Sequence, residues 1–316
     1  MKPRPWRLAV GALLYLVGVG FVAPLALVVA PLAALLALQR PGRREALVAA
    51  GLAVLTLWSW IGAPDAYERF GAAWTLLVVG SLVLVLSRRE AGTTRLVSSG
   101  LLTVSLAGGV GALLVGVTSF SFAQLTWLAN RHFSAQARLW IDAASGALAP
   151  GDSTARSALA AFESSSIALA DTVSRYLPGL VLLQSLAALA LAWALYRTIA
   201  REPEGTPLPS LREFRFNDHL IWGVVAALVT LVLPRLGPLH EVGGNLAAFF
   251  GGLYVLRGVG VLAALFGAAG MGGLGVMLFG VFVVLFLLPV AALVALALGV
   301  TDTWVDWRRR AAARQG

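Results

Sequence analysis

The chain has 316 residues, of which 59% are hydrophobic and only 12% are charged, whereas soluble domains carry about 25% charged residues. Several apolar runs reach the roughly 20 residues that one helix needs to cross a bilayer, and none shows the short alternating strands of a membrane barrel. Because the sequence has no cysteine, disulfides, thiolate metal sites and cysteine nucleophiles are excluded. The composition predicts an all-α, polytopic transmembrane helical bundle.

The net charge of +9 is distributed in a way that is typical of membrane topology. The basic residues stand singly or in short clusters at the ends of apolar runs, where the positive-inside rule places them. We therefore expect the lipid bilayer as a partner and no nucleic acid.

The first apolar run, residues 8–38, is longer than one span and short for two. It is also too long for the core of a signal peptide, so we expect a retained anchor. Pro24 and Pro31 lie inside it and would kink or break a helix. The run forms either two short segments or one long kinked helix.

Later apolar runs predict spans at 46–61, 72–86, 96–122, 177–196, 219–236, 242–266 and 274–300. Both ends of the chain carry basic clusters, which favours an even number of crossings with both termini inside. We therefore expect about eight spans, with roughly seven to nine compatible with the runs. Either the first stretch or one of the last three runs does not cross fully.

Residues 123–176 interrupt this pattern, because their charges are mixed and balanced. Leu159, Phe162 and Leu169 recur at helical spacing, which predicts an amphipathic helical insertion. It either lies on the membrane surface or caps the bundle outside the bilayer. The chain is then one membrane domain, 1–316, with N-terminal spans in 1–122 and C-terminal spans and a basic tail in 177–316.

The polar connection 197–218 is rich in proline and charge. It is a candidate cytoplasmic docking loop.

Arg257 is a charge inside an apolar run, and such residues cost at least about 2.5–3.5 kcal/mol and usually face a bundle interior. It could bind an anionic ligand, pair with an acid such as Glu241 or one from another span, or extend to the interface. The candidate ligand-binding residues are Arg257, Asn245, Tyr254 and Glu241.

The last run leaves the membrane through a pattern of acids, tryptophans and arginines. Tryptophan and arginine are typical of the bilayer interface, and Asp306 stands four residues before Arg310, which fits a helical ion pair. The residues predicted to anchor the chain or dock a partner are Asp302, Trp304, Asp306, Trp307 and Arg308.

Catalytic signatures are missing from the sequence: it has no phosphate-binding loop, no His-Glu-x-x-His and no Gly-x-Ser-x-Gly. The three histidines, His132, His219 and His240, lie far apart along the chain. We therefore expect no enzyme activity, no cofactor and no metal site.

The C-terminal third resembles the YybS-like family of predicted bacterial membrane proteins. The matching features are Leu211-Arg-Glu-Phe-Arg-Phe216, Gly244-Asn-Leu246, Tyr254-Val-Leu-Arg-Gly258 and Gly299-Val-Thr-Asp-Thr-Trp-Val-Asp-Trp-Arg308. The resemblance implies a bacterial cytoplasmic membrane, and the distribution of basic residues then predicts that both termini are cytoplasmic. The resemblance also implies a fold similar to the substrate-capturing subunits of vitamin transporters and to rod-shape-type envelope proteins, which is a likeness of fold and not of function.

Two functions fit these observations. The first is a transporter-like or small-solute-binding membrane protein with its site among the last three runs. The alternative is a structural or scaffolding protein of the cell envelope, which binds a membrane or envelope protein through loop 197–218 and the basic C-terminus.

Overall fold

The computed structural model describes residues 25–38, 42–61, 65–88, 96–118, 121–147, 153–268 and 288–313. All regular structure in these ranges is helical, which confirms the predicted all-α class. Among the described residues, four helices are long and apolar enough to cross a membrane: Ala66–Ser87, Ser99–Val117, Leu177–Ile199 and His240–Phe266. Parts of the predicted runs 8–38 and 274–300 lie outside the described residues, so the count of about eight spans stays a prediction.

The contacts divide the chain into two compact units, 1–206 and 207–316, and each is described by itself. The single membrane domain over residues 1–316 stays a prediction. The helices of the first unit are α2 (Ala26–Leu38), α3 (Arg43–Ile61), α4 (Ala66–Ser87), α5 (Leu96–Val117), α6 (Phe122–Gly146), α7 (Ser153–Arg175) and α8 (Leu177–Ile199).

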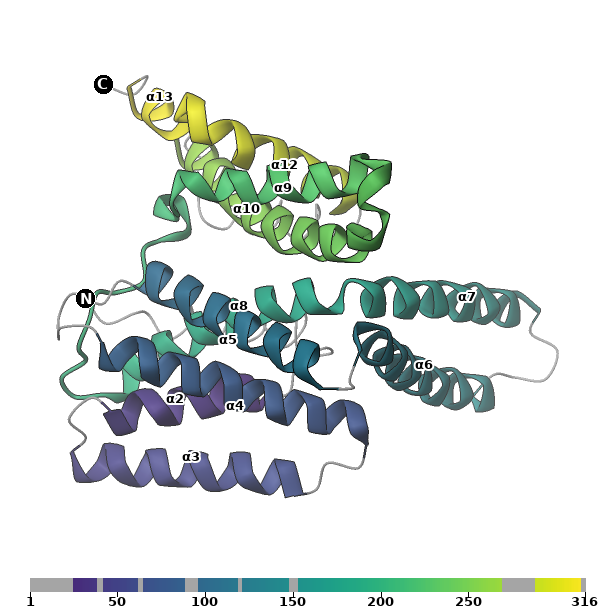
Figure 1. Cartoon of the computed structure of the whole chain (residues 1–316), viewed down its shortest axis with the longest axis horizontal. Helices are drawn as coiled ribbons and strands as arrows, with labels where there is room; N and C mark the ends of the chain where they lie inside the picture. The colour runs from purple at the N-terminus through teal and green to yellow at the C-terminus, as the bar shows by residue number, and fades with distance from the viewer. Residues whose placement is uncertain are drawn as a thin grey trace. The chain divides into compact units, whose positions relative to one another are not determined.

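Helices α2, α4, α5 and α8 form the packed part of the first unit (Figure 1), with α2 against α3, α4 and α8, and α5 against α4 and α8. The Trp74 indole of α4 donates a buried hydrogen bond of 2.9 Å to the Ser185 hydroxyl of α8. Gly108 of α5 faces the Leu182 side chain at close range. A small residue there lets α5 and α8 approach.

The predicted insertion is a helical hairpin of α6 and α7, which run side by side away from the packed helices (Figure 1). Ser121 and Gln124 form a reciprocal capping box at the start of α6, which satisfies backbone donors that the first turn would leave unpaired. Trp127, Trp140 and Leu169 are exposed on the hairpin. Placement of this hairpin on a membrane surface stays a prediction.

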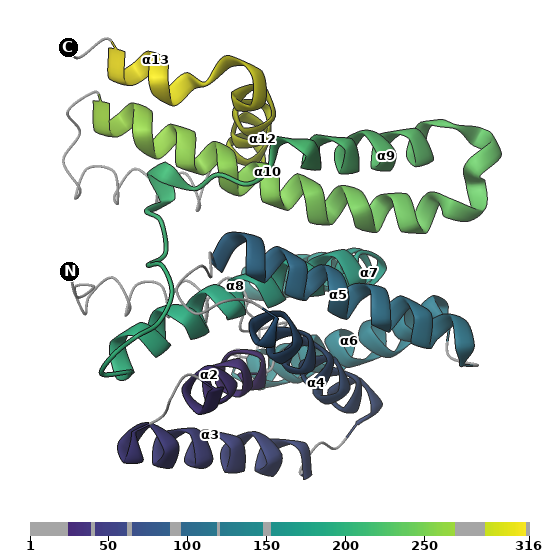
Figure 2. The same ribbon diagram turned by 60° about the vertical axis from the view of Figure 1, so that its left-hand side comes forward.

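The second unit begins with two short 3-10 turns, η1 (Leu211–Glu213) and η2 (Asp218–Leu220). It continues with α9 (Ile221–Val232), the 3-10 helix η3 (Pro234–Leu239), α10 (His240–Ala268), α12 (Leu288–Val305) and α13 (Trp307–Ala313). Helices α9 and α10 run antiparallel, and α12 packs on α10 (Figure 2).

Two glycines allow the close approach of α10 and α12. A Cβ atom on Gly258 would collide with the Ala295 backbone, and one on Gly299 would collide with the Tyr254 carbonyl. The two helix backbones are therefore in direct contact at this crossing. This contact brings Arg257, in the middle of α10, and Asp302, near the end of α12, to the same polar cluster.

Two helix boundaries differ from the sequence expectation. Helix α4 begins at Ala66, ahead of the predicted start at residue 72, because the Asp65 carboxylate accepts a hydrogen bond from the Glu68 amide as an N-cap. Helix α9 ends at Val232, inside the predicted span 219–236, shortly before Pro234, which cannot continue a helix that needs its amide donor.

Candidate functional site

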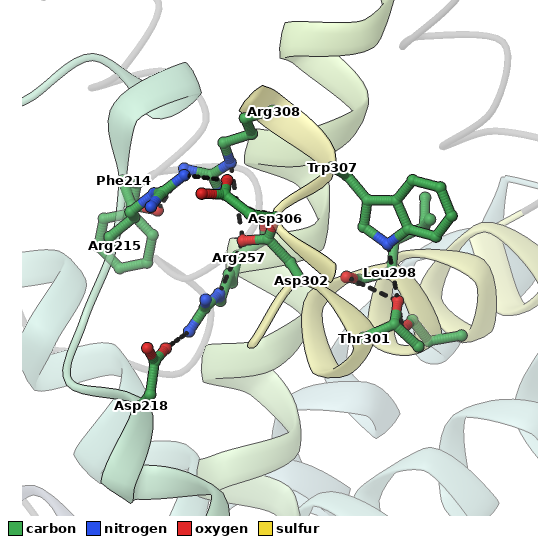
Figure 3. A network of polar contacts seen from close by, with 11 residues as sticks. Phe214, Arg215, Asp218, Arg257, Leu298, Thr301, Asp302, Asp306, Trp307 and Arg308 are labelled. Carbon is green, nitrogen blue, oxygen red and sulfur yellow. Dashed lines mark hydrogen bonds and ion pairs between the residues drawn. The ribbon is translucent and has the colours of Figure 1, made fainter. Parts of the chain in front are cut away.

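Three segments of the second unit meet in one cluster of polar contacts (Figure 3). The first is the stretch between η1 and η2, which supplies Phe214, Phe216 and Asp218. The second is α10, which supplies Arg257, and the third is the junction of α12 and α13, which supplies Asp302 and Arg308. We call these six residues the Arg257 cluster.

Arg257 is only 2% exposed. Its Nε donates a hydrogen bond of 3.0 Å to Asp302 Oδ2, and its Nη1 donates one of 2.6 Å to Asp218 Oδ1. The guanidinium lies over the Phe216 ring, with Cζ 5.4 Å from the ring centroid, which adds a cation–π contact. The charge of Arg257 is therefore shared between two carboxylates of the chain itself.

Arg308 of α13 also contacts all three segments of the cluster. Its Nη1 donates to the Phe214 carbonyl at 2.9 Å and its Nη2 donates to the Arg257 carbonyl at 3.0 Å. Its Nε lies 3.9 Å from Asp302 Oδ2. Burial lowers the pKa of Arg308, while the Asp302 carboxylate acts to raise it, and a guanidinium stays charged under such conditions.

The Asp302 side chain has no exposed surface and stands between the guanidinium groups of Arg257 and Arg308. A buried carboxylate without a counter-charge would lose several kcal/mol of solvation. Two guanidinium neighbours offset that loss and also reduce the cost of placing Arg257 in an apolar helix. Each charge therefore offsets the desolvation cost of the others, and loss of one leaves the remaining charges buried without a full set of counter-charges.

Asp306 separates α12 from α13. Its φ of 47° lies in the left-handed region, which aspartate tolerates better than most side chains. Its carboxylate binds Arg215 Nη2 at 2.5 Å and Arg309 Nε at 3.1 Å. Burial acts to raise the pKa of Asp306, but the hydrogen bonds and charges of Arg215 and Arg309 outweigh it and hold the pKa below its usual value.

Four buried polar atoms in and beside the cluster have no hydrogen-bond partner among the described residues. They are Tyr254 OH, Asp302 Oδ1, Thr303 Oγ1 and Arg308 Nε. The hydroxyls of Tyr254 and Thr303 approach each other without meeting full hydrogen-bond geometry. A buried polar atom without a partner costs about 1–3 kcal/mol, so a water or a small polar group that reached any of these atoms would be stabilised.

The four predicted ligand-binding residues lie at different places on α10. Arg257 lies in the cluster, and Tyr254 packs beside it with its ring 5.1 Å from Phe216. Asn245 lies about 18 Å away along the helix, twelve residues at 1.5 Å rise, and donates to the Glu241 carbonyl at 2.8 Å. Glu241 is exposed, and the partners of Arg257 are Asp218 and Asp302.

The predicted C-terminal anchor residues also divide. Asp302 and Arg308 form a buried ion pair and Asp306 forms exposed ones, whereas Trp304 is 69% exposed. The Trp307 indole donates to the Thr301 hydroxyl at 3.0 Å.

The expected pairing of Asp306 with Arg310 is replaced by pairs with Arg215 and Arg309. The reason is that the helix breaks at Asp306, whose φ is 47°, so its side chain does not have the direction that it would have inside a continuous helix. Arg310 lies over the Trp307 ring instead, at 5.9 Å.

Sequence reasoning missed the roles of Asp218, Phe216 and Arg215, which all belong to the end of loop 197–218. Alternating aromatic and basic residues just before an apolar run were a signal, as was an acid at the start of that run. Both were visible as features of the loop, but their partners lie far along the chain.

Comparison with known proteins places the chain among membrane proteins. A family model described as "Predicted membrane protein (DUF2232)" matches residues 8–303. No curated protein and no solved structure matches the chain. The membrane class predicted from composition is confirmed, while the YybS-like resemblance and the bacterial origin stay predictions. Because the match spans nearly the whole sequence, the chain belongs to the DUF2232 family of predicted membrane proteins.

Proposed function

We propose that this protein is a non-enzymatic scaffold of a bacterial cytoplasmic membrane, which binds a membrane or envelope protein through loop 197–218 and its basic C-terminus. The observation that carries the proposal is that Arg257 is almost completely buried and already engages Asp218 and Asp302. A free anion would have to displace one of these carboxylates. The charge of Arg257 therefore contributes to the stability of the fold and is not free to bind a ligand.

The cluster also makes one surface from two segments that are far apart in the sequence. Arg308 ties the C-terminal helix to the Phe214 carbonyl, and Arg215 ties the same loop to Asp306. Outside these contacts the loop exposes Leu211, and α13 exposes Arg309 with 86% of its side chain accessible. An apolar and cationic surface held in a fixed geometry suits a protein partner with acidic and apolar groups.

Site-specific photo-cross-linking in native membranes tests this proposal. A photoreactive residue at 211 or 309 should cross-link to one defined membrane or envelope protein, whereas the same residue at the exposed Ser164 of α7 should not. Asp218→Asn removes one charge from the Arg257 cluster and should weaken cross-linking from position 211. An identical pattern from all three positions, or no cross-link from 211 and 309, contradicts the proposal.

A second candidate, a transporter-like or small-solute-binding role with both termini cytoplasmic, is supported by the four buried polar atoms that lack partners. A small polar solute beside Tyr254 and Thr303 would satisfy them and would leave both ion pairs of Arg257 in place. The solute would then be recognised by hydroxyl and carboxylate groups more than by the Arg257 charge.

Thermal unfolding of the detergent-purified protein against a panel of small metabolites separates the two candidates. The scaffold proposal expects no metabolite to raise the unfolding temperature. A metabolite that stabilises the wild type but not Tyr254→Phe would favour solute binding. Arg212→Gln, a change in the exposed loop, is the control that should behave as the wild type does.

A further inference from the structure

The first unit contains a second polar cluster, formed by Asp65, Glu68 and His132. Asp65 caps α4, Glu68 lies in the first turn of that helix, and His132 comes from α6. One ligand atom from each of the three lies within 4.8 Å of the other two. Two ligands bound to the same ion at about 2.1 Å are at most about 4.2 Å apart, so small side-chain rotations would bring all three onto one ion.

Two of the three side chains are already held in place. Asp65 Oδ1 accepts a hydrogen bond of 2.8 Å from the Glu68 amide, and Asp65 Oδ2 lies 2.8 Å from His132 Nδ1. The Tyr67 ring stacks on the imidazole with centroids 4.6 Å apart, and Phe133 contacts both rings edge-on. Neighbours that fix the orientation of a ligand are typical of protein metal sites.

Asp65 and Glu68 occupy the N-cap and N3 positions of α4, where acidic side chains stabilise the first turn of a helix, whereas His132 comes from the separate helix α6. An N-cap and a His–Asp pair need only two side chains, and here a second carboxylate comes within reach of the first. Two carboxylates that share a site repel each other, and a cation bound between them would offset that repulsion. The imidazole nitrogen makes the donor set more suitable for a transition metal than for magnesium or calcium.

We propose that Asp65, Glu68 and His132 bind a divalent transition-metal ion of the zinc class, which clamps the base of the α6–α7 hairpin to the start of α4. The proposal is independent of the role of the Arg257 cluster, because all three ligands belong to the first unit. Three protein ligands leave at least one coordination position open, which a water would fill.

The test uses full-length protein without a histidine tag, in detergent, after treatment with a chelator. Zinc is titrated against a chromogenic competitor, and the thermal unfolding midpoint is followed in parallel. One ion should bind per chain and should raise the midpoint. Glu68→Gln, which leaves the cap and the His132–Asp65 contact in place, should weaken zinc binding by at least about tenfold and should remove the stabilisation.

His132→Asn should have the same effect on binding. The matched control, His219→Asn, changes an exposed histidine of the second unit and should leave affinity and midpoint shift at wild-type values. Hydrogen exchange supplies a readout that depends on the place of the ion: zinc should slow exchange in residues 122–135 of the wild type but not of Glu68→Gln. Stoichiometric binding that survives both substitutions, or no binding at all, overturns the proposal.

Discussion

The Arg257 cluster and the Asp65–Glu68–His132 cluster both join helices that are distant in sequence, but they do so in opposite ways. In the first, the buried Asp302 and the exposed Asp218 neutralise the buried guanidinium groups of Arg257 and Arg308. In the second, two carboxylates and one partly exposed imidazole converge, and no arginine or lysine is among the three. A polar cluster that balances its own charge holds the fold together. One that leaves an excess of negative charge has capacity for a cation.

The largest expected effect comes from removal of the buried counter-charge. Asp302→Ala leaves Arg257 with Asp218 alone and leaves Arg308 without a nearby carboxylate in the core of the cluster. Breaking a buried pair by removing one partner costs about 3–5 kcal/mol, and urea or thermal unfolding in detergent measures this loss.

The control for that change is Asp171→Ala, which removes an exposed ion pair with Arg175 in α7. Such pairs contribute about 0–1 kcal/mol. Equal losses of stability in the two variants would show that the Arg257 cluster is no more important to the fold than a surface pair.

An intermediate effect is expected where α10 meets α12. Gly258→Ala places a methyl group against the Ala295 backbone, and forced separation of packed elements costs about 1–3 kcal/mol. Since this contact sets the spacing of Arg257 and Asp302, the variant should also weaken their pairing.

Gly251→Ala on the same helix is the matched control, because a Cβ atom there meets nothing within 4 Å. It should be neutral or slightly stabilising, because alanine favours the helix. A ranking of the two variants in the reverse order, by unfolding midpoint, would refute the proposed close contact.

The smallest expected effect is a pH dependence at Asp306, whose carboxylate binds the partly exposed Arg215. Its pKa is lower in the folded protein than in the unfolded chain, where it is about 3.9. The pair therefore stabilises the fold above that value, and the contribution is lost as the pH falls through the folded pKa.

Asp306→Asn, which keeps a side chain that tolerates positive φ, should lower the unfolding midpoint at pH 7. The difference from the wild type should shrink as the pH is lowered toward 3. A difference that stays constant with pH would show that the carboxylate charge makes no contribution.

Hydrophobic runs were enough to predict the helical class and most of the helices, because each run is a local signal. The start of α4 at Ala66 was also within reach, since Asp65 is a typical cap residue. The charge of Arg257 stood out for the same local reason. The partners of Arg257 could not be predicted, because Asp218 and Asp302 lie 39 and 45 residues away and many other acidic residues were equally plausible partners.

The histidines are a second case in which the sequence does not reveal the partner of a residue. His132 was considered together with His219 and His240, which share its chemistry, whereas its contact in the structure is an aspartate 67 residues earlier in the chain. The pattern of residue types contains no information about this proximity. The two side chains come together only in the folded protein, where α6 packs beside α4.

The pairing of Arg257 with Asp302 has a consequence for synthesis of the protein. Asp302 follows Arg257 by 45 residues, which at about 5–20 residues per second takes roughly 2–9 s. During this interval Asp218 is already part of the chain, while Asp302 and Arg308 have not yet been translated. The last helices of the chain therefore complete the charge balance of a helix that is synthesised before them.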